Sequence, residues 1–189
     1  KFSMHVERIP LEVQDKMAEM KIEGKIKPKD SEAVKRFLEC GIPNDEAKKI
    51  WAVHNGNLLV DGTKGIQALH EIRELVIQGF FDAMDAGPLA KEKCAGVKVV
   101  LEDAKLHEDA IHRGPAQVFP AITRTIYACM LAAKPILEEP KQLLSINVPQ
   151  DFLGAVTKEI GSRRTQITEI KSEGDSNYII GLAPVKELI

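Results

Sequence analysis

The sequence feature that most constrains the fold is a long amphipathic segment between residues 65 and 86. Its apolar residues recur at steps of three and four, which places them on one face of an α-helix. These residues are Ile66, Leu69, Ile72, Val76, Phe80, Ala83 and Met84. Gly87-Pro88 follows, and this pair usually ends a helix. The pattern therefore predicts one long helix with a single apolar face.

Alternating or continuous apolar runs predict strands on both sides of this helix. One such run covers residues 2–9, and another begins at Val97 and continues to about Leu106. Residues 50–53 and 58–60 flank Asn55-Gly56. Two short strands joined by an Asn-Gly turn are typical of a β-hairpin.

Three shorter helices are expected before the hairpin. Apolar spacing indicates helices over residues 11–22 and 31–41, and another short helix begins near Pro43. Asp30 or Ser31 can cap the second of them, because their side-chain oxygens accept hydrogen bonds from the first helical amides. Helices that alternate with strands, together with 44% hydrophobic and 5% aromatic residues, indicate an α/β (α+β) fold.

A domain boundary is predicted at Leu137-Glu138-Glu139-Pro140, which divides the chain into residues 1–138 and 139–189. Beyond it a new βαββ pattern begins, with strands over 144–148, 167–170 and 178–182 and a helix over 151–160. This pattern is half of a ferredoxin-like βαββαβ unit. We expect the second helix and strand after Ile189, and without them we expect frayed, poorly packed strands beyond Gly161.

Charge and cysteine content narrow the class of protein. Lys and Arg number 26 against 28 Asp and Glu, so the formal net charge of −2 excludes a basic field over the whole chain, and any RNA contact must be local. Cys40, Cys94 and Cys129 are an odd number and lie far apart, which favours reduced thiols and a cytoplasmic location. With no apolar run of membrane-spanning length and no signal peptide pattern, no membrane partner is expected.

A long loop is predicted between the strand end at Leu106 and Pro120, which we expect to open a helix that stops before Pro135. A connection of this length is often functional. Gly114-Pro115 lets the backbone turn, and Arg113 adds a fork of hydrogen-bond donors beside the helix N-terminus. The loop is therefore a candidate for contact with phosphate groups.

Two histidines in this loop raise a metal site as an alternative. His107, Glu108 and His112 approach the H-E-x-x-H pattern of zinc hydrolases, but two zinc-binding histidines on one helical face need a spacing of four. Here the spacing is five, in a segment that Gly114-Pro115 makes poorly helical. We therefore expect no metal, although a metal-assisted hydrolase remains the alternative from the enzyme class.

The other polar and aromatic candidates are interpreted structurally. His5, His54 and His70 are expected to have structural roles, and Trp51 to anchor the core. Arg163-Arg164 should compensate the dipole at the end of a helix. Nucleotide-binding glycine loops, nucleophile elbows and C-x-x-C pairs do not occur in the sequence, so no catalytic residue is expected.

The segment from Leu106 to Gln117 resembles the diphthamide loop of the translation elongation factor two family, in its archaeal form because Gly114-Pro115-Ala116 replaces an all-glycine turn. The resemblance extends over nearly the whole chain. It includes Ala47-Lys48-Lys49-Ile50-Trp51, Asp61-Gly62-Thr63-Lys64-Gly65-Ile66-Gln67, Ala132-Ala133-Lys134-Pro135-Ile136-Leu137-Glu138-Glu139-Pro140 and Asn147-Val148-Pro149-Gln150-Asp151. Thr165 departs from the family, in which a glycine is usual after the two arginines.

The resemblance implies a fragment of a larger factor. Residues 1–138 would be the fourth domain, a ribosomal protein S5 domain 2-like fold without its first strand, and residues 139–189 part of a ferredoxin-like fifth domain. The GTPase site, with GTP and magnesium, would lie in domains outside this chain. The chain itself would then be no enzyme and hold no cofactor, while the full-length factor would be a ribosome-stimulated GTPase that drives translocation of tRNA and mRNA.

The resemblance also implies roles for loop residues. His112 would be the histidine converted to diphthamide, a bulky adduct with a quaternary ammonium and an amide. The residues that would contact the ribosome are His107, Asp109, Arg113, Gly114 and Gln117. The implied partners of this monomer are small-subunit rRNA, the tRNA–mRNA duplex, the diphthamide biosynthesis enzymes and ADP-ribosylating toxins that use NAD. A free-standing RNA-binding domain of similar fold remains a further alternative.

Overall fold

The computed structural model describes residues 1–66 and 68–188, and it divides the chain into two compact units, Lys1–Pro135 and Ile136–Ile189. The division lies close to the boundary predicted at 138/139. Each unit contains its own β-sheet, so the mixed architecture of helices and two sheets that the sequence predicts is confirmed.

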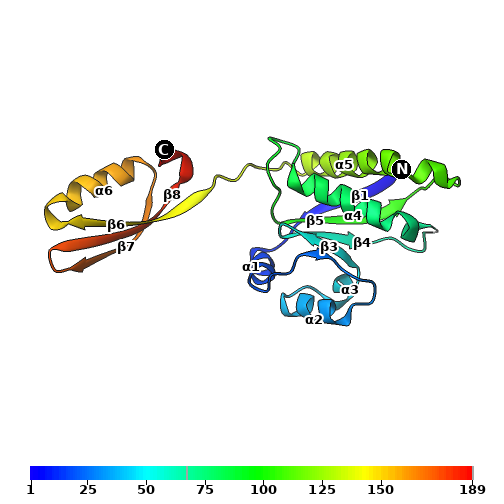
Figure 1. The fold of residues 1–189 in the computed structure, drawn as a ribbon, viewed down its shortest axis with the longest axis horizontal. Helices are drawn as coiled ribbons and strands as arrows, with labels where there is room; N and C mark the ends of the chain where they lie inside the picture. Colours follow the sequence, from blue (N-terminus) through cyan, green and yellow to red (C-terminus); the bar gives the residue numbers. More distant parts are fainter. Residues whose placement is uncertain (67, 189) are drawn as a thin grey trace. The chain divides into compact units, whose positions relative to one another are not determined.

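The first unit is built on a five-stranded sheet with the order β1-β5-β4-β3-β2 (Figure 1). Its strands are β1 (Phe2–Arg8), β2 (Gly24–Lys25), β3 (Ile50–His54), β4 (Asn57–Asp61) and β5 (Val97–Ala104). β4 and β5 run parallel, and the other neighbours are antiparallel. The strands predicted near the N-terminus, at the hairpin and after Val97 are therefore confirmed.

The predicted Asn-Gly turn joins β3 to β4. Asn55 and Gly56 both have positive φ values, of 51° and 72°. Two successive residues of this kind form the turn whose twist matches that of a hairpin, and asparagine and glycine tolerate the conformation better than other residues. The local sequence thus fixes the register of these two strands.

Two helices, α4 (Leu69–Asp85) and α5 (Pro115–Ala132), cover one face of this sheet (Figure 1). Their apolar side chains form the larger core with residues of the central strands, including Phe80, Ile126 and Leu101. α4 is the helix predicted over residues 65–86, but it begins at Leu69. Ile66 precedes the helix and packs at the edge of the core, and Gln67 lies outside the described residues.

Three short helices cover the other face: α1 (Leu11–Glu19), α2 (Ser31–Glu39) and α3 (Asn44–Ala47). They enclose a second core that includes Met17 and Phe37. As predicted, Asp30 caps α2, and its side chain accepts a hydrogen bond of 3.0 Å from the Ala33 amide. Because both faces of the sheet are covered, four consecutive residues of β4 are buried, from Asn57 to Val60.

The predicted start of α5 at Pro120 is wrong. The helix begins at Pro115, with Gly114 as its N-cap, and Pro120 lies inside it. Pro115 can take the first helical position because no helical partner exists for an N–H there. Pro120 then only removes one hydrogen bond within the helix. The loop after β5 is therefore shorter than predicted, and it includes the 3-10 turn Ala110–Arg113.

The second unit has the predicted βαββ order: β6 (Lys141–Pro149), α6 (Leu153–Ser162), β7 (Gln166–Glu173) and β8 (Ser176–Pro184). The strands form an antiparallel sheet with the order β6-β8-β7. Its core is small. The fully enclosed members are Val148, Ile160 and Ile179.

Frayed, poorly packed strands were predicted beyond Gly161; in the described residues the fraying is wrong, whereas the poor packing agrees with the exposure of β7. β7 pairs with β8 along its length, with one irregularity between Ile167 and Glu169. The prediction neglected this hydrogen-bond ladder, which forms even though most of β7 is exposed. As predicted, cations end α6: Arg163 lies 2.8 Å from Glu159. Arg164 has a positive φ of 56° and lies 2.8 Å from Glu139.

Candidate nucleic-acid interface

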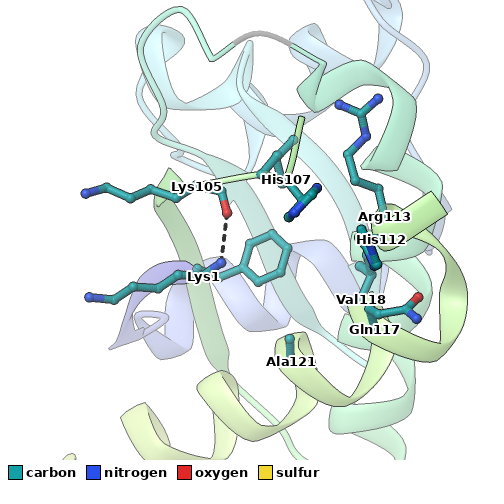
Figure 2. A pocket seen from close by; sticks show the side chains of 10 residues that line it. Lys1, Lys105, His107, His112, Arg113, Gln117, Val118 and Ala121 are labelled. Atoms are coloured by element: carbon teal, nitrogen blue, oxygen red, sulfur yellow. Dashed lines mark hydrogen bonds between the residues drawn. The ribbon is translucent and has the colours of Figure 1, made fainter. Parts of the chain in front are cut away.

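The loop after β5 lies at one end of the five-stranded sheet. Since β4 and β5 run parallel, the loops that follow both strands lie at this same end. The base of the loop is an extension of the β1–β5 pairing. The Lys105 amide donates to the Lys1 carbonyl at 2.8 Å, and the Lys1 amino group donates to the Lys105 carbonyl at 2.8 Å (Figure 2). Two paired strands therefore support the loop.

Asp109 organises the outer part of the loop. Its carboxylate accepts a hydrogen bond of 3.0 Å from the Ile111 amide, and its carbonyl accepts one of 3.2 Å from the His112 amide. Its own amide donates to Nδ1 of His107 at 3.1 Å. These short-range bonds form the 3-10 turn Ala110–Arg113, with Asp109 as its N-cap. Asp109 thus shapes this turn. The ribosome contact that the resemblance implies for Asp109 stays a prediction.

The structure brings the two loop histidines together. The ring centroids of His107 and His112 lie 4.5 Å apart in an edge-on arrangement with an interplanar angle of 66°. Both residues are exposed. They border a shallow hollow of about 600 Å³, whose lining also includes Phe2, Lys105 and Gln117. In Figure 2 the Lys105 side chain points away from the two histidines. An exposed pair of imidazoles beside lysines is suited to contact with a polyanion.

The guanidinium of Arg113, for which the sequence predicts contact with phosphate, forms an ion pair within the domain. Its Nη2 atom lies 2.8 Å from Oε2 of Glu71 in α4, and its side chain is only 15% exposed. Its Nε atom is buried and has no hydrogen-bond partner among the described residues. The guanidinium is therefore directed toward the body of the domain, and its proposed contact with phosphate would have to compete with Glu71.

Gly114 and Gln117 connect the loop to α5. The Gly114 carbonyl accepts hydrogen bonds from the amides of Gln117 at 3.1 Å and Val118 at 3.0 Å, which begin the helix. A Cβ atom on Gly114 would lie 3.3 Å from Oε1 of Gln117, a tight contact. Gln117 itself is exposed, so its amide is accessible beside the histidines.

Sequence reasoning missed several residues at this site. Ile111 is 74% exposed between the two histidines, and an isolated apolar residue in a polar loop was a signal that could have identified it. Lys1 and Lys105 extend from the base of the loop (Figure 2). Glu71 had no local signal, because its partner lies far away in the sequence.

Hydrolytic chemistry is not favoured by the described residues. Glu108 is exposed, and among residues 1–66 and 68–188 no group of three His, Cys, Asp or Glu side chains is arranged to hold a metal ion. Burial raises the pKa of the thiols of Cys40, Cys94 and Cys129 above the usual value, which keeps them protonated and poorly nucleophilic.

Two other histidines and Trp51 have the structural surroundings that were expected. Nδ1 of His5 lies 2.8 Å from Oε1 of Glu102, and His54 contacts two carboxylates. Trp51 packs against the larger core, and the Arg73 guanidinium lies 5.4 Å from its ring centroid. His70 is exposed on α4.

Protein-family models match both compact units of the chain. Residues 20–134 match the model of elongation factor G, domain IV, and residues 136–189 match that of the elongation factor G C-terminus. The chain therefore belongs to the elongation factor family that includes elongation factors G and 2. The two matched regions also meet where the structure divides into two units.

Individual relatives narrow this assignment to the archaeal branch. The chain is 50% identical over 190 residues to elongation factor 2 of Archaeoglobus fulgidus and 47% identical over 189 residues to that of Methanosphaera stadtmanae. Elongation factor 2 of Thermococcus kodakarensis is 47% identical over 190 residues. Each comparison covers the whole chain but 26% of the relative. The chain thus corresponds to about a quarter of such a factor.

No helix in the described part of the chain is both long enough and apolar enough to cross a membrane.

Proposed function

We propose that this chain is the part of an archaeal-type elongation factor 2 that enters the decoding site of the small ribosomal subunit during GTP-dependent translocation of tRNA and mRNA. The observation that carries the proposal is the exposed pair of His107 and His112, held on a loop with a two-stranded base. Family membership supplies the ribosome as the partner.

The chemistry of the loop suits RNA that must be contacted without regard to sequence. A short RNA helix presents a wide, shallow minor groove with 2′-hydroxyls, which proteins recognise mainly by shape. Imidazoles, the Gln117 amide and lysine side chains can hydrogen bond to hydroxyl and phosphate oxygens of any nucleotide. A translocation factor needs this kind of contact, since it acts on every codon.

His112 is the proposed site of diphthamide. The residue is exposed, and no described side chain hydrogen bonds to its ring, so modification enzymes can reach it. ADP-ribosylating toxins with NAD would reach the same ring. We expect the full-length factor to be a cytoplasmic monomer. Its GTP and magnesium would be bound by domains outside this chain. We assign the two units to the S5 domain 2-like and ferredoxin-like folds on their element order.

The test uses the full-length factor isolated from its natural host, with His112→Gln and the matched variant His107→Gln. Mass spectrometry of the loop peptide should find the modification in wild type and in His107→Gln, but not in His112→Gln. Diphthamide-specific toxin should transfer ADP-ribose to the same two proteins. His112→Gln should also slow translocation several-fold. Labelled His112→Gln protein, or translocation at the wild-type rate, would contradict the assignment.

The alternative functions have weaker support. A metal-assisted hydrolase would need a third ligand for His107 and His112, and the described residues place none there. A free-standing RNA-binding domain is disfavoured, because relatives that match this chain throughout are about four times longer.

A further inference from the structure

One ion pair joins the outer part of the loop to the body of the domain. Nη2 of Arg113 lies 2.8 Å from Oε2 of Glu71, in the first turn of α4. Among the described residues, no other side-chain hydrogen bond or ion pair connects residues 107–113 to an element outside the loop. The remaining bonds of the loop, centred on Asp109, are internal.

Apolar packing does not hold the loop in one orientation, so it cannot replace this ion pair. Residues 107–112 are all exposed, and Ile111 is directed away from both cores of the unit. An exposed segment of this kind gains little from burial to offset the entropy of a single conformation. The direction of the 3-10 turn relative to the sheet therefore depends on the Arg113–Glu71 contact.

Glu71 is well placed to provide a rigid anchor. The neighbouring residues Leu69 and Ile72 are buried in the larger core, which immobilises the first turn of α4. The helix N-terminus also favours a carboxylate at this position. A planar guanidinium binds a carboxylate with a defined direction, unlike an ammonium group. The pair therefore transmits a fixed orientation from α4 to the loop.

The Arg113–Glu71 ion pair contributes little to the stability of the fold. Arg113 loses most of its hydration, and its Nε atom is buried with no hydrogen-bond partner in ranges 1–66 and 68–188. A buried donor without a hydrogen-bond partner is destabilising, and this cost offsets the gain from the ion pair. Ion pairs that contribute little stability can still specify one geometry.

We propose that Glu71 is a positioning residue for the loop: it holds Arg113, and through Arg113 it sets where the adjacent His112 stands. This inference deepens the proposed function and rests on it, because the orientation matters only if His112 contacts the ribosome. Glu71 itself touches no RNA in this proposal.

The primary test compares Glu71→Gln with Glu74→Gln in the full-length factor. Glu74 is a matched control, because it lies on the same helix, is 59% exposed and pairs with Lys25 at 2.6 Å, away from the loop. Glu71→Gln should reduce the translocation rate by roughly tenfold, since small misplacements of a contacting group are costly in rate. Its affinity for ribosomes should stay within about twofold of wild type, because the lysines and imidazoles remain. Glu74→Gln should change neither quantity.

A spectroscopic measurement separates positioning from general destabilisation. In factor labelled at histidine and phenylalanine, the cross-relaxation between the ring of His112 and that of Phe2 in β1, which border the same hollow, should weaken in Glu71→Gln and persist in Glu74→Gln. The double variant Glu71→Arg with Arg113→Glu should restore both this signal and part of the rate.

The outcomes distinguish this inference from the proposed function. Wild-type ring contact and wild-type rate in Glu71→Gln would overturn the positioning role. Loss of ring contact in Glu71→Gln, together with an unimpaired His112→Gln variant, would support the positioning role and overturn the proposed function instead.

Discussion

Two histidine-bearing turns lie at opposite ends of the same sheet and differ in what surrounds the ring. In the β3–β4 hairpin, Nδ1 of His54 lies 2.9 Å from Glu23 and Nε2 lies 2.9 Å from Asp85. The ring stacks on Phe81 with a centroid distance of 4.4 Å, and its side chain is 20% exposed. In the loop after β5, His112 is exposed and its ring lies edge-on to that of His107 at a centroid distance of 4.5 Å.

The difference shows that residue type alone does not mark a functional histidine. Both ring nitrogens of His54 are engaged, so the ring joins the hairpin to α4 and to the segment before β2. His112 has the opposite arrangement, in which the backbone is fixed and the ring is available. An imidazole that is held structurally has no remaining capacity to bind a ligand, whereas one that is fixed only through its backbone retains it.

The end of the sheet that carries the β3–β4 hairpin is stabilised by the buried side chain of Asn57. This side chain is fully buried; its Nδ2 donates to the carbonyls of His54 and Cys94 at 2.8 Å each, and its Oδ1 accepts from the Val97 amide at 2.8 Å. Nothing comparable lies beneath the His112 turn in the described residues. One end of the sheet is therefore built for rigidity and the other for access.

The largest expected effect that tests this contrast comes from Asn57→Ala. It leaves two carbonyls and one amide unsatisfied, at about 1–3 kcal/mol each before relaxation, so the free energy of unfolding should fall by about 3 kcal/mol. Denaturant unfolding followed by the fluorescence of Trp51 measures it, since this is the one tryptophan of the chain. Gln117→Ala, in the accessible end, is the control and should change stability little. If Asn57→Ala lowered the free energy of unfolding by less than about 1 kcal/mol, the two ends of the sheet would not differ in this way.

A smaller effect is expected from the two histidines themselves. His54→Ala should cost about 1–2 kcal/mol, because it removes the contacts of the ring with Glu23, Asp85 and Phe81. Both carboxylates keep their hydrogen bonds from Asn55, which limits the loss. His112→Ala should change the free energy of unfolding by less than about 0.5 kcal/mol. The same unfolding measurement compares both variants. Equal losses would mean that the two rings have the same structural role.

The smallest expected effect is a change in the free energy of unfolding at acidic pH. The hydrogen bond from His54, with a further one from Asn55, holds the pKa of Asp85 below its usual value of 3.8. The unfolded chain therefore takes up this proton at a higher pH than the folded chain. The stabilising contribution of Asp85 should be complete above that usual value and disappear as the pH falls through the lowered one.

Asp85→Asn tests this expectation. The difference in unfolding free energy between wild type and variant should be constant near neutral pH and shrink below about pH 4. Asp82→Asn, at an exposed position on the same helix, is the control variant. A difference that grows with acidification would contradict the assigned role of Asp85.

Much of the fold could be predicted because its signals are local. Alternation in β1 and β5, the spacing along α4 and the Asn55-Gly56 turn each depend on neighbouring residues. The start of α5 was wrong because Pro115 and Pro120 both fit the beginning of a helix, and only tertiary structure decides between them. The Arg113–Glu71 contact could not be predicted, since no spacing rule connects a loop residue with a helix that precedes it by a whole strand.

Adjacent residues in the 3-10 turn have opposite environments, with Arg113 turned inward and His112 turned outward. A substituent added to the imidazole of His112 would therefore extend into solvent without displacing any packed neighbour. Enlargement of that ring requires no repacking of the domain, so folding can be complete before the side chain is altered. A larger side chain at position 112 would extend farther from the domain surface, and the packing of the domain interior would not change.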